Sequence, residues 1–469
     1  MTARKFAAIF AVLLLCTFPL CADEVDRYVS GFMQRHGIPG MSLAVVRQGK
    51  LVKVAGYGKS NLELNVDATA ESVFEIGSIT KQFTAEAILM LVEEGKISLE
   101  APVCRYLPAC PAAWEKIKIR HLLTHTSGLS DWEANGYISY RQQYTAEEYI
   151  KAVGAHPLDF QPGERWAYTN SAFPLLGMVV ERVTGGSYEQ FVSERIFRPA
   201  GMTATRFKHA GDIVANRSGG YVDEGGQLHS GEPLRPLVIA PNGGIMSTAG
   251  DMGRWLSAYF GGRLLKPSTV EQMLTMVKLN NGEPGSSGMA WFRNSFKKHR
   301  MVLHNGSTVA GFSSVVYHYP DDDLSVVVLF NIDRWNAVNV LAQHVAGMYV
   351  PGASVDSLPE RSDPEPELTR TMLRFLTELG EGKDPEMLAD NLRGRVSKDR
   401  RASIAAEMKQ LKSFTFVDKE GLSGEAQKRF GSVIRWIYRY RLTNEKFPVY
   451  YTIELTPEKK VARFVPEED

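Results

Sequence analysis

A serine and a lysine three residues apart, in Ser78-Ile79-Thr80-Lys81, are the first residues in this sequence whose spacing suits catalysis. The apolar residues at 79, 83, 87, 88 and 91 recur at the period of a buried helix. Residues three apart lie on one side of a helix, so the Lys81 amine can reach the Ser78 hydroxyl. A lysine can take the proton of a serine if burial lowers its pKa enough to keep the amine neutral. The pair therefore predicts nucleophilic catalysis by Ser78.

Two further polar motifs follow this pair in chain order. The first is Tyr168-Thr169-Asn170, and the second is His304-Asn305-Gly306, which continues an apolar run typical of a strand. A second Ser-x-x-Lys match, Ser295-Phe296-Lys297-Lys298, has no apolar helix behind it and lies among basic residues. We predict that this second match is a solvated turn without a catalytic role.

With three motifs in this order, residues from about 25 to 350 resemble the serine β-lactamase-related hydrolases. That family includes class C β-lactamases, D,D-peptidases, D-aminopeptidases and related esterases. The sequences around the motifs resemble the family as well: Phe74-Glu75-Ile76-Gly77-Ser78, Arg120-His121-Leu122-Leu123-Thr124-His125-Thr126-Ser127-Gly128-Leu129 and Gly243-Gly244-Ile245-Met246-Ser247-Thr248-Ala249.

The resemblance implies catalytic roles for three residues. Ser78 attacks a carbonyl carbon and forms an acyl-enzyme, and Lys81 is the base or holds the proton network. Tyr168 relays a proton to the leaving group, for which we expect its phenol pKa to be perturbed in a cationic site. The structural alternatives are a helix N-cap for Ser78 and a turn with a packed aromatic ring for Tyr168.

The resemblance also implies substrate-binding roles. Asn170 positions Lys81 and the substrate amide, and Gly306 leaves room for the substrate backbone against its strand. Backbone N–H groups of Ser78 and Ser307 form the oxyanion hole. His304 stands where many β-lactamases carry lysine, and histidine in this place is more typical of the peptidases and esterases. It either supplies a partial charge for a substrate carboxylate or is a neutral buried histidine that holds the strand.

No metal or cofactor is expected. His121 and His125 are four residues apart, which suits zinc on a helix, but Leu122 stands where a metalloprotease motif has glutamate. The formal net charge of +1 over 469 residues and the lack of a basic stripe exclude nucleic acid as a partner.

The N-terminus predicts export. Arg4 and Lys5 precede an apolar run over residues 6–15, which is typical of a secretory signal covering residues 1–22 and too short for a comfortable membrane span. A soluble exported protein is favoured over a lipoprotein, because leucine precedes both cysteines of this segment. The remaining cysteines, Cys104 and Cys110, either form a disulfide that closes a short loop or stay as separate thiols.

The order of the elements predicts a mixed α/β (α+β) fold: an antiparallel sheet with flanking helices plus a helical subdomain, with the active site between them. In the hydrolase domain, 23–350, we expect strands at 41–46, 51–55, 301–304, 312–319 and 324–331 and a helix at 336–349. A linker at 351–366 leads to a small α+β accessory domain at 367–469. Its expected helices are 367–381, 384–393 and 398–411, and its expected strands are 413–417, 433–442, 448–455 and 460–465.

Residues 434–442 of the accessory domain alternate between apolar and mainly basic side chains, which predicts one packed face and one basic face. This sheet either binds a ligand or is purely structural.

The sequence thus predicts an exported serine hydrolase acting through an acyl-enzyme on D-amino-acid peptides or related amides. An esterase or class C-like β-lactamase is the alternative within the same class. A non-catalytic penicillin-recognising or sensor protein is the alternative from another class. The expected partner is a small peptide, amide or ester substrate, and the oligomeric state is left open.

Overall fold

The computed structural model describes residues 23–139, 142–209, 211–232, 240–359, 361–422, 427–429, 432–444 and 448–466. The predicted signal segment, residues 1–22, lies outside these ranges. Each helix within the described ranges is too short or too polar to span a bilayer.

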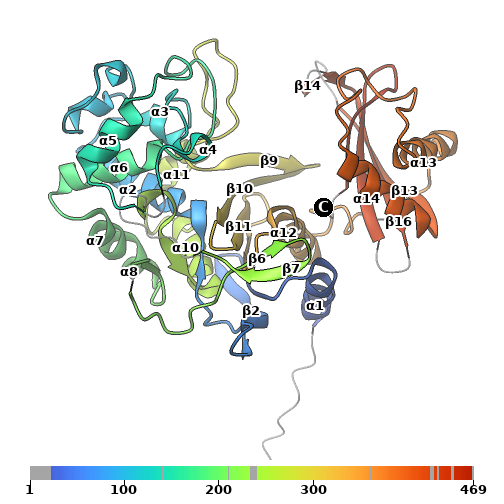
Figure 1. Cartoon of the computed structure of the whole chain (residues 1–469), viewed down its shortest axis with the longest axis horizontal. Coiled ribbons are helices and arrows are strands. Elements are labelled where there is room, and N and C mark those ends of the chain that lie inside the picture. Colours follow the sequence, from blue (N-terminus) through green and yellow to red (C-terminus); the bar gives the residue numbers. More distant parts are fainter. Residues whose placement is uncertain are drawn as a thin grey trace, which may run out of the picture.

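A seven-stranded antiparallel sheet joins segments from the two ends of the region that carries the motifs (Figure 1). Its order is β3-β2-β1-β12-β11-β10-β9. The strands are β1 (Gly40–Arg47), β2 (Lys50–Asn61), β3 (Val66–Asp67), β9 (Phe292–Phe296), β10 (His299–Thr308), β11 (Phe312–Tyr319) and β12 (Leu324–Phe330). All residues of β11 and β12 are buried, because the sheet is covered on both faces and these strands are central.

Different helices cover the two faces of this sheet. Helices α1 (Glu24–His36) and α12 (Trp335–Tyr349) pack on one face, with Met41, Val315 and Val328 in the same core. Helix α10 (Ala249–Phe260) packs on the other face, whose core continues into the helical part of the molecule. The expected strands and the expected helix at 336–349 are confirmed, with β1, β2 and β10 extending beyond the predicted ranges.

The middle of the chain forms the predicted helical subdomain. Its helices are α2 (Thr80–Glu93), α3 (Ile119–Leu123), α4 (Trp132–Asn135), α5 (Ala146–Gly154), α6 (Ala172–Thr184), α7 (Tyr188–Val192), α8 (Arg198–Ala200), α9 (Ala240–Gly243) and α11 (Pro267–Leu274), with 3₁₀ helices η1 (Gly77–Ile79), η2 (Val103–Arg105) and η3 (Ala112–Trp114) and the π-helical turn η4 (Ser193–Phe197). Short strands complete it: β4 (Phe74–Glu75), β5 (Arg206–Phe207), β6 (Tyr221–Glu224), β7 (Gln227–Ser230) and β8 (Ile245–Ser247).

Helix α2 is central to this subdomain. Residues Thr80–Leu91 are all buried, including polar positions that a one-sided helix would turn toward water. The apolar spacing predicted a buried helix, and α6, α7 and α9 pack around it.

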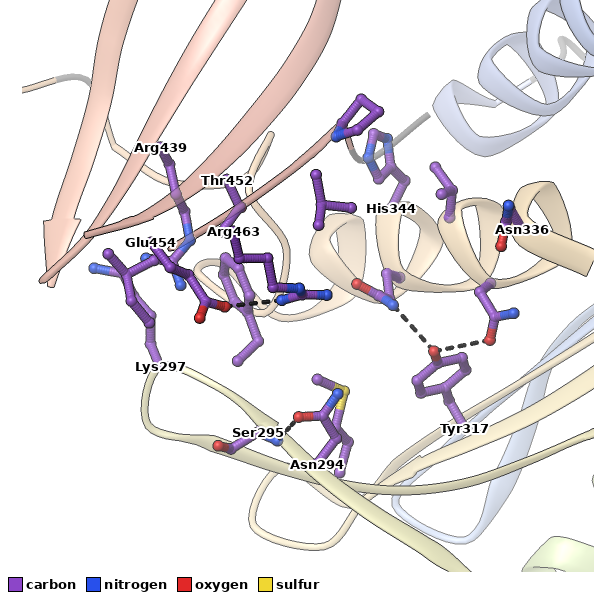
Figure 2. A pocket seen from close by; sticks show the side chains of 18 of the residues that line it. Asn294, Ser295, Lys297, Tyr317, Asn336, His344, Arg439, Thr452, Glu454 and Arg463 are labelled. Carbon is purple, nitrogen blue, oxygen red and sulfur yellow. Dashed lines mark hydrogen bonds and ion pairs between the residues drawn. The ribbon is translucent and has the colours of Figure 1, made fainter. Parts of the chain in front are cut away.

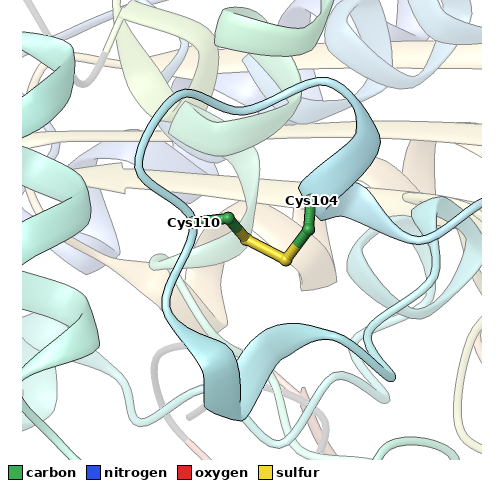
Figure 3. Close-up of a disulfide and its surroundings, with 2 residues drawn as sticks. All are labelled: Cys104 and Cys110. Carbon is green, nitrogen blue, oxygen red and sulfur yellow. A yellow bond between two sulfur atoms is a disulfide. The ribbon is translucent and has the colours of Figure 1, made fainter.

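A disulfide bond joins Cys104 and Cys110, whose Cα atoms are 5.3 Å apart (Figure 3). The bond closes a loop that begins at η2 and ends before η3. Of the two alternatives left open by the sequence, the structure has the disulfide.

The C-terminal segment, residues 366–466, has a hydrophobic core of its own and lies to one side of the rest (Figure 1). It contains α13 (Pro366–Gly380) and α14 (Lys398–Lys409) and a four-stranded sheet in the order β13-β16-β17-β18. These strands are β13 (Ser413–Gly421), β16 (Trp436–Thr443), β17 (Pro448–Leu455) and β18 (Val461–Pro466), and a separate pair consists of β14 (Gln427–Arg429) and β15 (Ser432–Ile434).

One expectation for this segment is wrong. Residues 384–393 are not helical, because the backbone there bonds to β18: Val461 donates to the Met387 carbonyl at 2.7 Å, and Ala389 donates to the Val461 carbonyl at 2.9 Å. On the basic face of β16, Arg439 is only 5% exposed and forms ion pairs with Asp418 and Glu420 at 3.0 Å each.

The predicted solvated turn at 295–298 is also only partly correct. Lys297 has a positive φ of 53° and lies at the tight turn between β9 and β10. Phe296, however, is buried, and its ring centroid lies 4.7 Å from the Arg439 guanidinium. Lys297 forms an ion pair with Asp418. The β9–β10 hairpin therefore contacts the C-terminal segment, toward which β9 points in Figure 1.

Candidate active site

Ser78 lies in η1, immediately before α2, where the backbone turns sharply out of β4. Gly77 makes this turn with a positive φ of 49°, which disfavours residues with a side chain. A Cβ on Gly77 would lie 2.7 Å from the carbonyl oxygen of Ser307 and 2.9 Å from its nitrogen. The backbones that carry the two expected oxyanion-hole N–H groups, those of Ser78 and Ser307, are thus brought together.

Gly306 permits a close approach within the protein that the sequence did not predict. A Cβ at this position would lie 2.0 Å from the backbone oxygen of Ile76 and 2.4 Å from the Ser314 hydroxyl. The Ser314 hydroxyl donates to that Ile76 oxygen at 2.9 Å. The missing side chain therefore lets β10 approach the turn before Ser78, whereas the sequence argument assigned that space to the substrate backbone.

Lys81 is fully buried and its amine lies 2.8 Å from the Ser78 hydroxyl, as the spacing predicted. Its second partner is the backbone oxygen of Asn242 in α9, at 3.1 Å. Burial lowers the pKa of Lys81 to about 7, although the carboxylates of Glu133 and Asp131 act in the opposite direction. A neutral amine in contact with a serine hydroxyl can accept its proton, so the pair can generate a nucleophile near neutral pH.

Tyr168 completes this group from the other side. Its ring lies 5.1 Å from the Lys81 amine, and its hydroxyl bonds to Ser78. Burial raises the pKa of Tyr168, and the bond to Ser78 only partly opposes this effect. The phenol pKa is thus perturbed, and the direction is upward: Tyr168 is a neutral phenol, which can donate a proton to a leaving group and recover it from Lys81.

His125 supports Tyr168 and was not expected to do so. The two rings stack with centroids 4.4 Å apart, and His125 Nδ1 accepts a hydrogen bond from the Thr169 backbone N–H at 3.2 Å. Burial lowers the pKa of His125 well below its usual value, so the ring is neutral. His121 does not join it, because its Nδ1 accepts from the Lys118 backbone N–H at 3.2 Å.

His304 is a neutral residue. It is 2% exposed, and burial, with a smaller contribution from Lys81, lowers its pKa to about 3. Its Nδ1 lies 2.6 Å from the carbonyl oxygen of Asn305, so Nδ1 carries the proton and donates it to that oxygen. Of the two alternatives for His304, the structure favours the neutral buried histidine over a charged group for a substrate carboxylate.

Asn170 contacts two carboxylates that the sequence argument had not considered. The backbone N–H of Asn170 donates to Asp131 at 3.0 Å, and its side-chain amide donates to Glu133 at 2.5 Å. Asp131 also caps α4, which carries Glu133. The expected contact between Asn170 and Lys81 is thus replaced by one to Glu133. The only sequence feature that could have indicated this contact is the acidic pair Asp131 and Glu133 at the start of a short helix, and such pairs are too common to be specific.

These residues line a cavity of about 380 Å³ between the helical subdomain and the sheet. Ser78, Glu133, Tyr168 and Asn170 come from the helical side. The sheet side supplies Phe292, His304, Asn305, Ser307, Thr308 and Val309, followed by Asp333 and Trp335. Strand β9 begins at Phe292, opposite Leu303, so its pairing with β10 does not extend to His304. The strand that faces the cavity is left open to an extended substrate.

A serine in contact with a lysine whose pKa is lowered to about 7, and a protonated tyrosine beside them, define the site of a serine hydrolase. Residues 25–346 match the sequence profile of the Beta-lactamase family. The chain therefore belongs to the Beta-lactamase family of serine hydrolases.

Known proteins similar to this chain include one curated relative and two solved structures. Protein flp of Staphylococcus aureus (strain N315) is 29% identical over 330 residues, which are 69% of this chain and 65% of flp. The chain thus spans just under two thirds of that relative's length. The octameric penicillin-binding protein homologue from Pyrococcus abyssi is similar in fold, with a TM-score of 0.60 and 24% identity over 93% of this chain and 90% of the homologue. The D-amino acid amidase from Ochrobactrum anthropi SV3 has a TM-score of 0.58 and 26% identity over 66% of this chain and 91% of the amidase.

Proposed function

We propose that this hydrolase forms an acyl-enzyme on Ser78 and acts on small amides and peptides whose reacting residue carries a free amino group. The observation that carries this proposal is the charge of the cavity. Among the described residues that line it, the acidic side chains are Glu133 and Asp333, no lysine or arginine is present, and the buried His304 is neutral. A cavity of this kind attracts an ammonium group and disfavours a carboxylate.

The chemistry follows from the contacts of Ser78. Its oxygen attacks the amide carbon while its proton passes to the Lys81 amine. Backbone N–H groups of Ser78 and Ser307 stabilise the oxyanion. Tyr168 donates its proton to the departing nitrogen and recovers one from Lys81, so the amine leaves and the acyl group stays on Ser78. A water molecule then adds to the ester, giving its proton to the same network and releasing the acid and the serine.

The D-amino-acid preference rests on similarity. The amidase from Ochrobactrum anthropi is named for D-amino acid amides, and its chain is 91% covered by the match. The cavity of about 380 Å³ suits one amino-acid residue and its amide. We therefore assign D-amino acid amides and short peptides with an N-terminal D residue as the substrate class.

The nucleophile is tested with Ser78→Ala. A fluorophosphonate or penicillin probe should label wild type at the peptide that contains Ser78 and should not label the variant. Turnover should fall on the order of 10³-fold or more. Labelling of the variant at the wild-type rate would refute the assignment of Ser78.

The ammonium-binding role is tested with Glu133→Gln. The ratio of kcat/KM for a D-amino acid amide to that for its N-acetyl analogue should fall about tenfold, because a charge-assisted hydrogen bond is lost. The exposed Glu147→Gln on α5 is the matched control and should leave the ratio unchanged. An unchanged ratio in Glu133→Gln, with both substrates hydrolysed, would contradict an amine-binding cavity.

We also propose that the protein is exported and that residues 367–469 form an accessory domain. The disulfide between Cys104 and Cys110 supports export to an oxidising compartment. The separate hydrophobic core of the C-terminal segment supports the proposal that this segment is an accessory domain. Mass spectrometry of the mature protein from a fractionated host tests export, since removal of residues 1–22 leaves a defined new N-terminus.

A further inference from the structure

A second cavity, a groove of about 740 Å³, lies between the C-terminal segment and the back of the active-site sheet (Figure 2). Its walls are β9 with the start of its turn, α12, and strands β13, β16, β17 and β18 of the C-terminal segment. The contacts of Phe296 and Lys297 with Arg439 and Asp418 hold the hairpin against this segment.

This groove and the active-site cavity share two lining residues. Asn305 and Trp335 line both. Asn305 directly follows His304, and Trp335 is 48% exposed although it is a large apolar residue. A ligand that passes from the cavity into the groove would therefore cross an exposed indole ring, which can stack on a planar amide or a ring.

The chemistry of the groove suits an uncharged polar chain. Its charged side chains include matched pairs: Arg463 bonds to Glu454 at 2.8 Å, and Arg439 bonds to Glu420 at 3.0 Å. The wall between these pairs and the cavity is rich in side-chain amides, which offer donors and acceptors together: Asn294, Asn305, Asn336, Asn339 and Gln343. A peptide backbone presents the same alternation of N–H and C=O groups.

The amides of α12 are held in place by the sheet. Asn305 donates to Asn339 at 2.8 Å, Tyr317 donates to the same Asn339 oxygen at 3.1 Å, and Gln343 donates to the Tyr317 hydroxyl at 3.0 Å. In Figure 2 the dashed lines of the two hydrogen bonds of Tyr317 meet at its labelled side chain. This wall is fixed before any ligand arrives, which lowers the entropic cost of binding.

We propose that this groove binds the part of a peptide substrate that lies C-terminal to the scissile bond. The inference rests on the proposed function, because it takes the free amino group of the reacting residue to be held at Glu133 on the helical wall. A chain anchored there crosses the cavity to the sheet wall, where Asn305 and Trp335 open into the groove. The C-terminal segment thereby completes a binding surface for peptides longer than the reacting residue.

The experiment compares one scissile residue in two substrates, a D-amino acid amide and a peptide of about four residues with the same D residue at its N-terminus. Asn294→Trp and Asn336→Trp, each in the full chain, place a large ring at exposed positions that line the groove and not the active-site cavity. Each variant should lower kcat/KM for the peptide about tenfold, mainly through KM, and leave the amide within about twofold. Lys298→Trp, exposed in the same hairpin but outside the groove, is the matched control and should change neither.

The outcomes separate the two proposals. If wild type hydrolyses neither substrate, the proposed function fails. If it hydrolyses the amide but the groove variants leave the peptide unaffected, or reduce both substrates equally, the groove proposal alone is overturned. Selective competition against the peptide by a neutral oligosaccharide, without competition by the free C-terminal peptide fragment, would assign the groove to a glycan and overturn the peptide assignment.

Discussion

Lys81→Met removes the amine that contacts Ser78 and replaces it with an uncharged side chain of similar length. Turnover should be lost, because Ser78 loses its proton acceptor. The same change should make the folded protein more stable at neutral pH. Lys81 is held in a dry interior, where its charged form is disfavoured.

The size of this stabilisation follows from the pKa of Lys81, which falls from the ordinary 10.5 to about 7 in the folded protein. Between these two values the unfolded chain binds more protons than the folded one, so stability rises with pH across this window. Compared with a neutral side chain at this position, the lowered pKa of Lys81 reduces the unfolding free energy by about 4 kcal/mol at pH 7 and by about 1 kcal/mol at pH 9.5. A methionine at position 81 does not titrate, so it adds no pH dependence to the unfolding free energy.

The assay is urea unfolding of wild type and Lys81→Met, followed by tryptophan fluorescence at several pH values from 7 to 9.5. The difference in unfolding free energy between the two proteins should shrink by about 3 kcal/mol across this range. Taking the difference cancels the other groups that titrate in both proteins. Lys50→Met, at an exposed lysine, is the control and should show a difference that stays constant with pH.

A difference between wild type and Lys81→Met that does not change with pH would refute the reasoning. It would mean that Lys81 stays charged in the folded protein, and a charged amine cannot accept the serine proton. In wild type, kcat/KM should correspondingly rise as the pH rises through about 7, since the neutral form of Lys81 is the active one.

Two further predictions concern the neighbours of this pair. Tyr168→Phe should lower kcat for amides by about 10²-fold or more. It should lower kcat for activated esters less, because an ester leaving group needs little proton donation. Equal losses of kcat on both substrates in steady-state kinetics would contradict the proton-donor role of Tyr168. Gly306→Ala should abolish activity and lower the unfolding free energy by several kcal/mol, because the new Cβ would lie 2.0 Å from the Ile76 carbonyl oxygen. A variant with wild-type stability in urea would contradict this close approach.

The sequence was most informative where one interaction dominates. Five strands of the large sheet, β1, β2, β10, β11 and β12, were predicted because they contain apolar runs, and β12 is buried along its whole length. The contact of Lys81 with Ser78 was predicted because three residues along a helix fix the direction of both side chains. Both inferences need only local geometry.

Prediction failed where distant segments decide the outcome. Residues 384–393 have the apolar spacing of a helix, but their backbone pairs with β18. Strand β9 is short and polar, and its place at the sheet edge depends on β10 and on contacts with Asp418 and Arg439. The role of Glu133 became visible only when the fold brought α4 against Asn170. The pKa direction of Tyr168 depends on burial, which no motif reveals.

The burial of α2 on every side has a consequence for how this enzyme can change its specificity over generations. Each side chain from Thr80 to Leu91 touches a packed neighbour, so most substitutions there would unfold the protein before they altered its substrate. The cavity rim is different, because Glu133 and Trp335 are exposed and belong to separate elements. We therefore expect substitutions that retune the substrate to be tolerated better at the rim than in α2. Mutant libraries aimed at new substrates should sample the rim and leave α2 untouched.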